Sequence, residues 1–328
     1  MRAVRLVLTV VLVLVTGWGT AAIWVDGPAS RPLAGVIAAA FALASGASLT
    51  VLRPPYLGLT ASALLCAGVV GWWLGIEPSN DRDWLADVAR PPRARLEGSS
   101  LTIENVRHFA YRSETDWTER WETRHWDLDR LQGIDFYVIY WGSPKIAHTI
   151  VSWVFEDAPP LAVSIETRKE KGEAYSALLG FFRQFELYYV VADERDLIGL
   201  RTHHRGEDVH LYRLSTPPPV ARAILLDYVD EMNRMADHAV WYNALTHNCT
   251  TTIRHHVQSV APGNPLDWRM IVNGYIDELG YERGTIDTSL PFAELKRLSF
   301  INERARASGI DADFSARIRE GMPVPDGS

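Results

Sequence analysis

The chain has 328 residues and a formal net charge of −7 at pH 7. Four arginines and one aspartate give residues 1–76 a charge of +3, so the 252 residues that follow carry −10. This acidic balance excludes nucleic acid as the expected partner, because phosphate contacts need a basic surface. The acidic part has one cysteine, so it forms no internal disulfide and depends on its core for stability.

Three apolar stretches without charged residues open the sequence. They are Leu6–Val25, Leu33–Leu52 and Tyr56–Ile76, each of 20 or 21 residues. A helix needs about 20 apolar residues to cross a bilayer core, so we expect residues 1–76 to be a membrane anchor of three transmembrane helices. A signal peptide cleaved near Ala21-Ala22 is the alternative for the first stretch, although two spans would remain.

The arginines of the anchor indicate its orientation. Arg2, Arg5 and Arg53 lie on one side of the expected spans, and Arg31 lies on the other. The positive-inside rule therefore places the N-terminus in the cytoplasm. Three crossings then bring the chain after Glu77 to the outer side of the membrane. None of the three spans carries an ionisable side chain, so no ion path through the membrane is expected.

The next part of the chain is polar and rich in proline. We expect residues 77–97 to be a linker with a short helix around Asp83–Ala89. The soluble domain is then expected to span residues 98–328, with a first strand at Leu101–Ile103. Cys66, inside the third membrane span, is expected to be a packing residue.

Strand patterns dominate the middle of the domain. Alternation predicts a strand at Ile134–Tyr140, and β-branched and aromatic residues predict another at His148–Phe155. A turn rich in proline and acidic residues follows, and Leu161–Thr167 is the expected return strand. Such a hairpin brings Glu166 near His148.

The remaining elements alternate between strands and helices. We expect a helix at Glu173–Gln184, strands at Phe185–Ala192 and Val209–Leu214, a polar turn at His203-His204, a helix after Thr216 with proline in its first turn, and a loop at Trp241–Asn248. Cys249 then begins a helix whose expected apolar face is Ile253, Val257 and Val260.

Cys249 is the main candidate for chemistry. A lone thiol at a helix start lies where the helix dipole and unpaired N–H groups favour the thiolate. His148, His247 and the pair His255-His256 are candidate bases. Two alternatives stay open: an inert buried cysteine, and a zinc site made from His247, Cys249 and His256, although the spacings typical of zinc ligands are missing.

Several motifs suggest a known family. They are Ala147–Thr149, Ser164–Glu170, Ala192–Ile198, Arg201-Thr202, Gly206–Leu214 and Asn243–Thr251. With these motifs, the chain from about Ile134 to Phe300 resembles the N-terminal periplasmic domain of Lnb, the bacterial lipoprotein N-acyltransferase. The most specific motif is the last one, which contains Cys249.

The resemblance implies a fold and a site. The fold would be α+β: three transmembrane helices followed by a circularly permuted papain-like (NlpC-like) domain, in which helices pack on a small antiparallel sheet. His148 and Cys249 would be the catalytic pair, and Glu166, at a matching position, would orient the imidazole. Apart from the resemblance, we expect the Cys249 N–H at the helix start, together with the Asn248 side chain, to stabilise an oxyanion. In the family's namesake the membrane helices follow this domain, whereas here three spans precede it.

The expected protein is a membrane-anchored periplasmic thiol acyltransferase of the bacterial inner (cytoplasmic) membrane. It would act on acyl groups of lipids or lipoproteins through a Cys thioester, with no cofactor and no metal. The alternatives are a cysteine peptidase or amidase acting on cell-wall peptides, and a non-enzymatic envelope protein. Arg168, Arg195 and Arg201 would bind phosphate headgroups or pair with neighbouring acids. The sequence leaves the acyl donor, the acceptor and the oligomeric state open.

Overall fold

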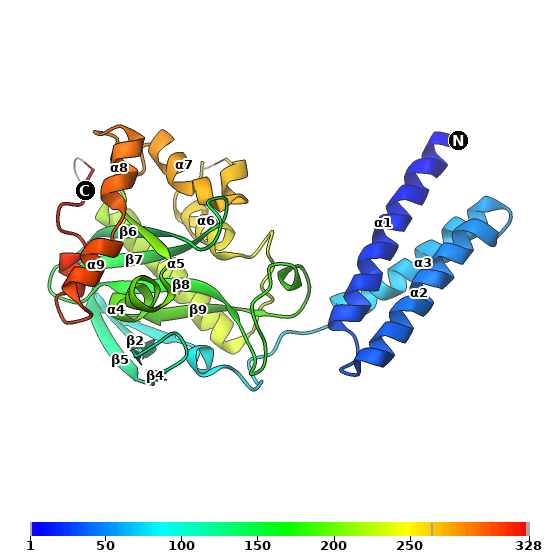
Figure 1. The fold of residues 1–328 in the computed structure, drawn as a ribbon, viewed down its shortest axis with the longest axis horizontal. Coiled ribbons are helices and arrows are strands. Elements are labelled where there is room, and N and C mark those ends of the chain that lie inside the picture. Colours follow the sequence, from blue (N-terminus) through cyan, green and yellow to red (C-terminus); the bar gives the residue numbers. More distant parts are fainter. Residues whose placement is uncertain (1, 264, 326–328) are drawn as a thin grey trace. The chain divides into compact units, whose positions relative to one another are not determined.

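The computed structural model describes residues 2–263 and 265–325. These residues form two compact units. The first, here called the anchor unit, contains residues up to 79 together with 175–186 and 241–243. The second, here called the sheet domain, contains the other described residues. Figure 1 traces the chain through both units.

The anchor unit contains the three expected helices. They are α1 (Arg2–Asp26), α2 (Arg31–Val51) and α3 (Pro55–Leu74). All three are long and apolar enough to cross a membrane, as predicted. The prolines near the starts of α2 and α3 fit their positions, because a first helical turn needs no donor from them.

Small and polar side chains hold these helices together. Ser45 of α2 forms hydrogen bonds of 2.8 Å with Thr16 of α1 and with Ser62 of α3. A Cβ at Gly58 would lie 2.3 Å from the Ser48 carbonyl oxygen, so only glycine permits this close approach of α3 to α2. Such close contact is typical of helices packed in lipid. Cys66 is 4% exposed and packs in the same interior, as predicted.

The sheet domain is built on an eight-stranded sheet. Its strands are β1 (Arg93–Glu97), β2 (Ser100–Arg107), β5 (Trp121–Asp127), β6 (Leu131–Tyr140), β7 (Ala147–Phe155), β8 (Leu161–Arg168), β9 (Glu186–Ala192) and β10 (Asp208–Arg213). The order is β1-β2-β9-β8-β7-β6-β10, and β5 also pairs with β2. A separate two-stranded ribbon pairs β3 (Ala110–Tyr111) with β4 (Trp117–Thr118).

The sheet differs in two ways from the expectation of a small antiparallel one. It has eight strands, and β2 runs parallel to β9, with Arg107 opposite Ala192. The first strand is Arg93–Glu97 and not Leu101–Ile103, because β1 forms a hairpin with β2 around Gly98. The predicted linker therefore ends earlier than residue 97, and its expected helix is only the 3₁₀ turn η1 (Ala86–Val88).

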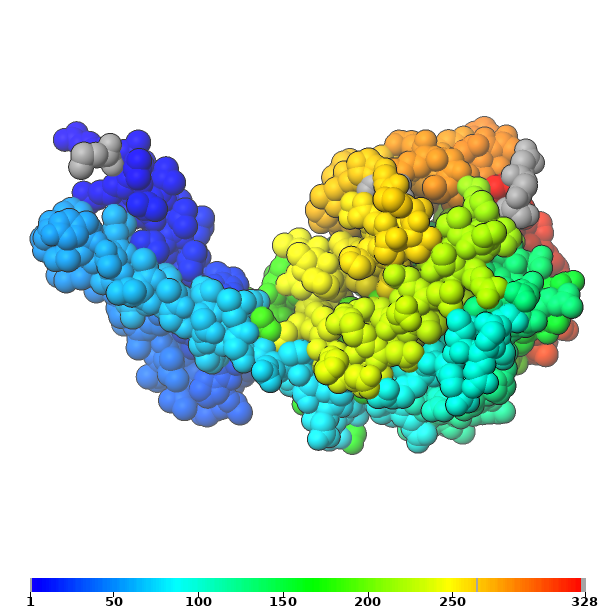
Figure 2. All heavy atoms as spheres, turned by 180° about the vertical axis from the view of Figure 1, so that it is seen from behind, coloured from blue at the N-terminus to red at the C-terminus, as the bar shows by residue number. Residues whose placement is uncertain are grey.

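Helices cover both faces of the sheet. The main ones are α4 (Glu194–Gly199), α5 (Pro218–Asp237), α6 (Cys249–Val260), α7 (Ile276–Glu282), α8 (Phe292–Ser299), α9 (Asn302–Ser308) and α10 (Phe314–Arg317). In Figure 1, α4 lies in front of the sheet. Figure 2 shows the opposite side, where the yellow-green atoms of α5 and the yellow atoms of α6 lie over the sheet. Together with the sheet, these helices make an α+β domain.

Each face has its own apolar core. Tyr137 and Ile139 of β6 pack with Ile198 of α4 and Phe314 of α10. On the opposite face, the Trp153 indole N–H donates to a backbone carbonyl of α5 at 3.0 Å. Full burial of a large apolar side chain contributes about 1.5–3 kcal/mol, so this two-sided core supplies the stability that a chain without disulfides needs.

The stretch Glu173–Gln184 is not the expected helix. It forms turns and the short 3₁₀ segment η3 (Leu179–Phe181). Its apolar residues Tyr175, Leu178, Leu179 and Phe182 do recur at a helical spacing, but Gly180 in the same stretch disfavours a helix. The expected turn at His203-His204 is also wrong, because both residues lie in the π-helix η4 (Leu200–Arg205). This π-helix continues α4, and neither of the two was predicted.

The buried face of α6 differs from the predicted one. Ile253, Val257 and Val260 are only half-buried, whereas Thr252 and His256 are buried. The reason is that His256 finds hydrogen-bond partners inside the domain, so its polar atoms can be buried. Apolar spacing alone therefore predicted the wrong residues for the buried face of α6.

Candidate active site

A capping box begins α6 and fixes the position of Cys249. The Asn248 side-chain oxygen accepts from the Thr251 N–H at 3.0 Å, and the Thr251 hydroxyl accepts from the Asn248 N–H at 3.0 Å. Cys249 is consequently the first residue of the helix, as predicted. The N–H groups of Cys249 and Thr250 have no acceptor within the helix, and the helix dipole favours negative charge beside them.

Asn248 is engaged in this cap through both ends of its amide. Besides the contact with Thr251, its Nδ2 donates to the Ala244 carbonyl at 2.7 Å. These bonds define a structural role in starting α6. The expected contribution of Asn248 to an oxyanion site stays a prediction.

His148 is positioned by two strand pairings. It lies near the start of β7, opposite Ile139 of β6. The β7–β8 register pairs Ile150 with Ser164, so two residues further along, Glu166 comes beside His148. His148 Nε2 lies 2.7 Å from the Ser164 hydroxyl and 3.1 Å from Glu166 Oε1. The predicted approach of Glu166 to His148 in this hairpin is confirmed.

The thiol of Cys249 and the imidazole of His148 lie close enough for each to shift the pKa of the other. Because Nε2 faces Glu166 and Ser164, the nitrogen left for the sulfur is Nδ1. Cys249 is 8% exposed, and 13% of the His148 side chain is exposed. The structure thus brings together three of the four predicted residues, from α6, β7 and β8, in one chain of contacts.

The pKa values of this pair are shifted in opposite directions, so that the pKa of the imidazole comes to lie above that of the thiol. Burial by itself raises the pKa of Cys249, but the hydrogen bond and charge of His148 lower it to about 7. Burial lowers the pKa of His148, but the charge of Glu166 and the contact with Cys249 raise it to about 9. Between these values a thiolate and an imidazolium coexist.

Glu166 stays ionised because cations surround it. Burial favours its neutral form, but His148, followed by Arg201, holds the pKa of its carboxyl well below the usual range. Arg201 Nη2 lies 2.9 Å from Glu166 Oε1, and Ser164 donates to the same oxygen at 2.6 Å. Arg201 is carried by the π-helix η4, a kind of helix that is frequent at functional sites.

Three arginines, Arg168, Arg195 and Arg201, were expected to bind headgroups or to pair with acids. Arg201 binds Glu166, and Arg195 binds Asp193 at 2.7 Å. Arg168 is 1% exposed and stacks over the Trp84 ring, 4.2 Å from its centroid. Arg195 and Arg201 therefore pair with acids, which is one of the two roles expected for them. Arg168 and Arg201 are both buried.

Asn273, which the sequence did not suggest, joins the two halves of the site. Its Oδ1 accepts from the Ala147 N–H at 2.9 Å, and its Nδ2 donates to the Thr250 hydroxyl at 2.8 Å and lies 3.9 Å from Cys249 Sγ. It therefore connects the start of β7 to the start of α6. It belongs to the 3₁₀ turn η6 (Asn273–Tyr275), where a Cβ on Gly274 would lie 2.2 Å from a backbone oxygen.

A second histidine centre lies beside the first. His256 Nδ1 lies 2.6 Å from Asp227, and its Nε2 lies 2.6 Å from the Tyr189 hydroxyl. Its ring stacks on Tyr228, with ring centroids 3.8 Å apart. Since both nitrogens of His256 have partners, His148 is the histidine that faces the thiol.

No metal cluster accompanies the thiol in the part of the chain that the structure describes. His247, one member of the alternative zinc site, is exposed and contacts the hydroxyl of its neighbour Thr246 at 2.9 Å. His256 uses both nitrogens elsewhere. The three residues of that alternative thus do not converge on one point.

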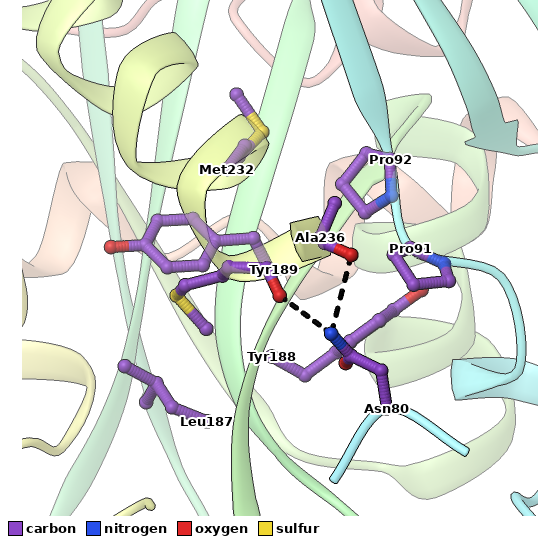
Figure 3. A pocket seen from close by; sticks show the side chains of 9 residues that line it. Asn80, Pro91, Pro92, Leu187, Tyr188, Tyr189, Met232 and Ala236 are labelled. Carbon is purple, nitrogen blue, oxygen red and sulfur yellow. Dashed lines mark hydrogen bonds between the residues drawn. The ribbon is translucent and has the colours of Figure 1, made fainter. Parts of the chain in front are cut away.

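A small pocket of the sheet domain lies away from these residues. It is bounded by β9, by the C-terminal end of α5 and by Pro91-Pro92. Figure 3 shows Asn80 in it, donating to the carbonyls of Met235 and Ala236 at 2.9 and 3.2 Å. None of the residues that line it is Cys249, His148 or Glu166, so this pocket is not part of the candidate site.

Comparison with known proteins identifies the domain. Residues 117–274 match the family model of the Lnb N-terminal periplasmic domain. The predicted resemblance is confirmed, although the match begins before Ile134 and ends before Phe300. A search of curated proteins and one of solved structures gave no match. With three helices able to span a bilayer, this is a membrane-anchored protein with a periplasmic domain.

Proposed function

We propose that this protein is a thiol acyltransferase of the bacterial inner membrane, which transfers acyl groups of lipids or lipoproteins through a thioester on Cys249. The observation that carries the proposal is the chain of contacts from Cys249 through His148 to Glu166. A sulfur that ionises near pH 7 beside a protonated imidazole is an activated nucleophile. The family of the domain supports an acyl-transfer chemistry for it.

In the first half-reaction, the Cys249 thiolate attacks the carbonyl carbon of an ester. A C–S bond forms and the C–O bond of the ester breaks. The leaving alkoxide takes the proton of the His148 imidazolium and departs as an alcohol. The enzyme is left as a thioester with a neutral imidazole, whose orientation Glu166 maintains.

In the second half-reaction, an amine attacks the thioester. A C–N bond forms, the C–S bond breaks, and His148 takes the proton that the amine loses. This restores the thiolate and the imidazolium. Water in place of the amine gives hydrolysis by the same steps, so the acceptor decides between transfer and hydrolysis.

The charge of the tetrahedral intermediates needs donors near the sulfur. The N–H of Cys249 at the start of α6 is one candidate, because it has no acceptor within the helix. Asn273 Nδ2, 3.9 Å from Cys249 Sγ, is another. Asn248 is the third candidate from the sequence, and its commitment to the helix cap ranks it below the other two.

Mass spectrometry of the full chain purified from membranes tests the proposal. We expect an acyl-sized mass on the peptide that contains Cys249, which neutral hydroxylamine removes because it cleaves thioesters. The adduct should persist in Cys66→Ser and disappear in Cys249→Ser. Lipid and lipoprotein profiles of a deletion strain, rescued with the same two variants, then connect the adduct to its biological product.

The alternatives predict other outcomes. A peptidase or amidase would carry no stable acyl group and would cleave cell-wall peptides in a reaction that requires Cys249. A non-enzymatic envelope protein would restore the deletion strain equally well with Cys249→Ser. Either result contradicts the acyltransferase proposal.

A further inference from the structure

A short segment of the anchor unit exposes large apolar side chains. Tyr175 is 49% exposed, Leu178 is 75% exposed and Phe181 is 38% exposed. They lie within seven successive residues, which form turns and the 3₁₀ segment η3. We call residues 175–182 the apolar loop. An exposed apolar cluster is unfavourable in water, and it marks a contact surface when it is contiguous.

The residues that follow the apolar loop are bonded to one end of the helix bundle. The Arg183 N–H donates to Asp26 at 3.2 Å, and Gln184 Nε2 donates to the same carboxylate at 2.8 Å. Arg183 Nη1 also donates to the Ile76 carbonyl at 2.8 Å. Asp26 ends α1, and Ile76 follows α3, so these bonds hold the loop where two membrane helices end.

Aromatic rings at the same place define the level of the membrane surface. The guanidinium of Arg183 lies 4.4 Å from the centre of the Trp73 ring. Trp73 also donates to Asp26 at 2.7 Å and packs edge-on against Trp18, with ring centroids 5.1 Å apart. Tryptophan with a neighbouring charge is typical of the boundary between hydrocarbon and headgroups.

The length of the chain limits how far the loop can be from this boundary. Phe181 precedes Arg183 by two residues and Leu178 precedes it by five. At no more than about 3.6 Å per residue, they lie within about 7 Å and about 18 Å of it. The headgroup region on each side of a bilayer is about 5–8 Å thick, so Phe181 cannot leave the neighbourhood of the membrane surface.

We propose that the apolar loop inserts Leu178 and Phe181 into the outer leaflet, as a second membrane contact besides the three helices. The occupant of this surface is the bilayer itself, because the loop continues the surface that the anchor already presents to lipid. This inference does not depend on catalysis by Cys249. The apolar loop is part of the connection between β8 and β9, and its insertion would hold this connection at the membrane surface. Glu166 lies on β8.

Depth-dependent quenching in proteoliposomes tests this inference. The full chain with Cys66→Ser and Cys249→Ser receives one new cysteine, at Leu178, and an environment-sensitive fluorophore on it. Lipids with a nitroxide at a shallow position of the acyl chain should quench this label several-fold more than a nitroxide in the water phase does. Its emission should also shift to the blue.

Two matched labels decide the outcome. Leu14 of α1, 67% exposed within a membrane span, is the positive control that shows insertion of the anchor. Leu96 of β1, 40% exposed on the sheet domain, is the control for a label in water. If Leu14 is quenched by lipid and Leu178 behaves like Leu96, the inference is overturned. Because the tested protein lacks Cys249, the result is independent of the proposed acyl transfer.

Discussion

Two histidines of the sheet domain, the partly buried His148 and the buried His256, each have a carboxylate partner. His148 has Glu166 at 3.1 Å, and His256 has Asp227 at 2.6 Å. Their pKa values nevertheless move in opposite directions. The pKa of His148 rises to about 9, whereas burial, which outweighs the attraction of Asp227, lowers that of His256.

The difference lies in what faces the second nitrogen. For His148 it is the ionisable sulfur of Cys249, which favours the imidazolium together with Glu166. For His256 it is the hydroxyl of Tyr189, a neutral group, and the ring of Tyr228 stacks on the imidazole. A carboxylate partner therefore does not identify a catalytic histidine by itself. What distinguishes His148 from His256 is the group that faces the second ring nitrogen.

Replacing each of the two histidines with alanine, one at a time, should give the largest difference between them. His148→Ala removes the proposed general acid and base, and such a group contributes about 10²–10⁴-fold to a rate. We expect thioester formation to fall by that factor, measured by mass spectrometry of the Cys249 peptide over time. His256→Ala should reduce it by less than about tenfold once the folded fraction is matched. Comparable losses in both variants would make His256 part of the chemistry.

The pH dependence of thiol labelling should distinguish the same two residues. The lowered pKa of Cys249 means that thiolate accumulates as the pH rises through about 7. Iodoacetamide labelling of Cys249 should follow this curve, and in His148→Ala its midpoint should move above about 8.5, the ordinary thiol value. The midpoint is the decisive quantity, because a thiolate of higher pKa is also more nucleophilic. A midpoint unchanged by His148→Ala would contradict the pairing.

For acyl transfer the same shifts define a window. The imidazolium of His148 persists until the pH passes about 9, because its pKa is raised. Since the thiolate needs a pH above about 7, the reaction rate should be largest between these two values and fall on either side.

Glu166→Gln should affect the upper limb of that window. Without the carboxylate charge, the pKa of His148 falls toward its ordinary value, since Glu166 is the largest of the groups that raise it. We expect the limb near pH 9 to move down by about two units and the rate at pH 8 to fall about tenfold. Rates across the pH range measure both effects.

Glu207→Gln is the matched control for this variant. Glu207 lies 3.5 Å from Arg201, which also binds Glu166, so the control removes an acidic neighbour of the same arginine. It leaves the partner of His148 in place, and the alkaline limb should stay where it is. A shift of equal size in the control would show that Arg201, and not the contact with His148, controls the titration.

Local patterns made half of the site predictable. The turn after β7 and the alternation on both sides of it fix a hairpin, and the hairpin brings Glu166 to His148 whatever the rest of the fold does. The helix start at Cys249 is equally local, because Asn248 and Thr251 form the cap within four residues. Such features need no knowledge of distant contacts.

The other half depends on contacts between distant segments. Arg201 reaches Glu166 from a π-helix that apolar spacing does not reveal, and Asn273 lies 24 residues beyond the thiol that it helps to position. The polar buried face of α6 was missed for the same reason, since the partners of His256 come from α5 and β9. Hydropathy can indicate which residues are buried only when buried polar groups are few.

His256→Phe should be the smallest perturbation of the chemistry and a clear one of stability. The ring keeps the stacking on Tyr228, but the Tyr189 hydroxyl loses its acceptor in a buried place, whereas Asp227, 33% exposed, is rehydrated. A lost buried hydrogen bond of this kind costs about 1–3 kcal/mol of unfolding free energy. Thermal melting of the full chain in detergent should show a drop of about 2–4 °C for each kcal/mol, with a Cys249 labelling midpoint that stays at about 7. The double variant Tyr189→Phe, His256→Phe removes the Tyr189 hydroxyl that the single variant leaves unpaired, and it should recover part of the lost stability. A labelling midpoint that moves in either variant would instead join the two histidine centres into one site.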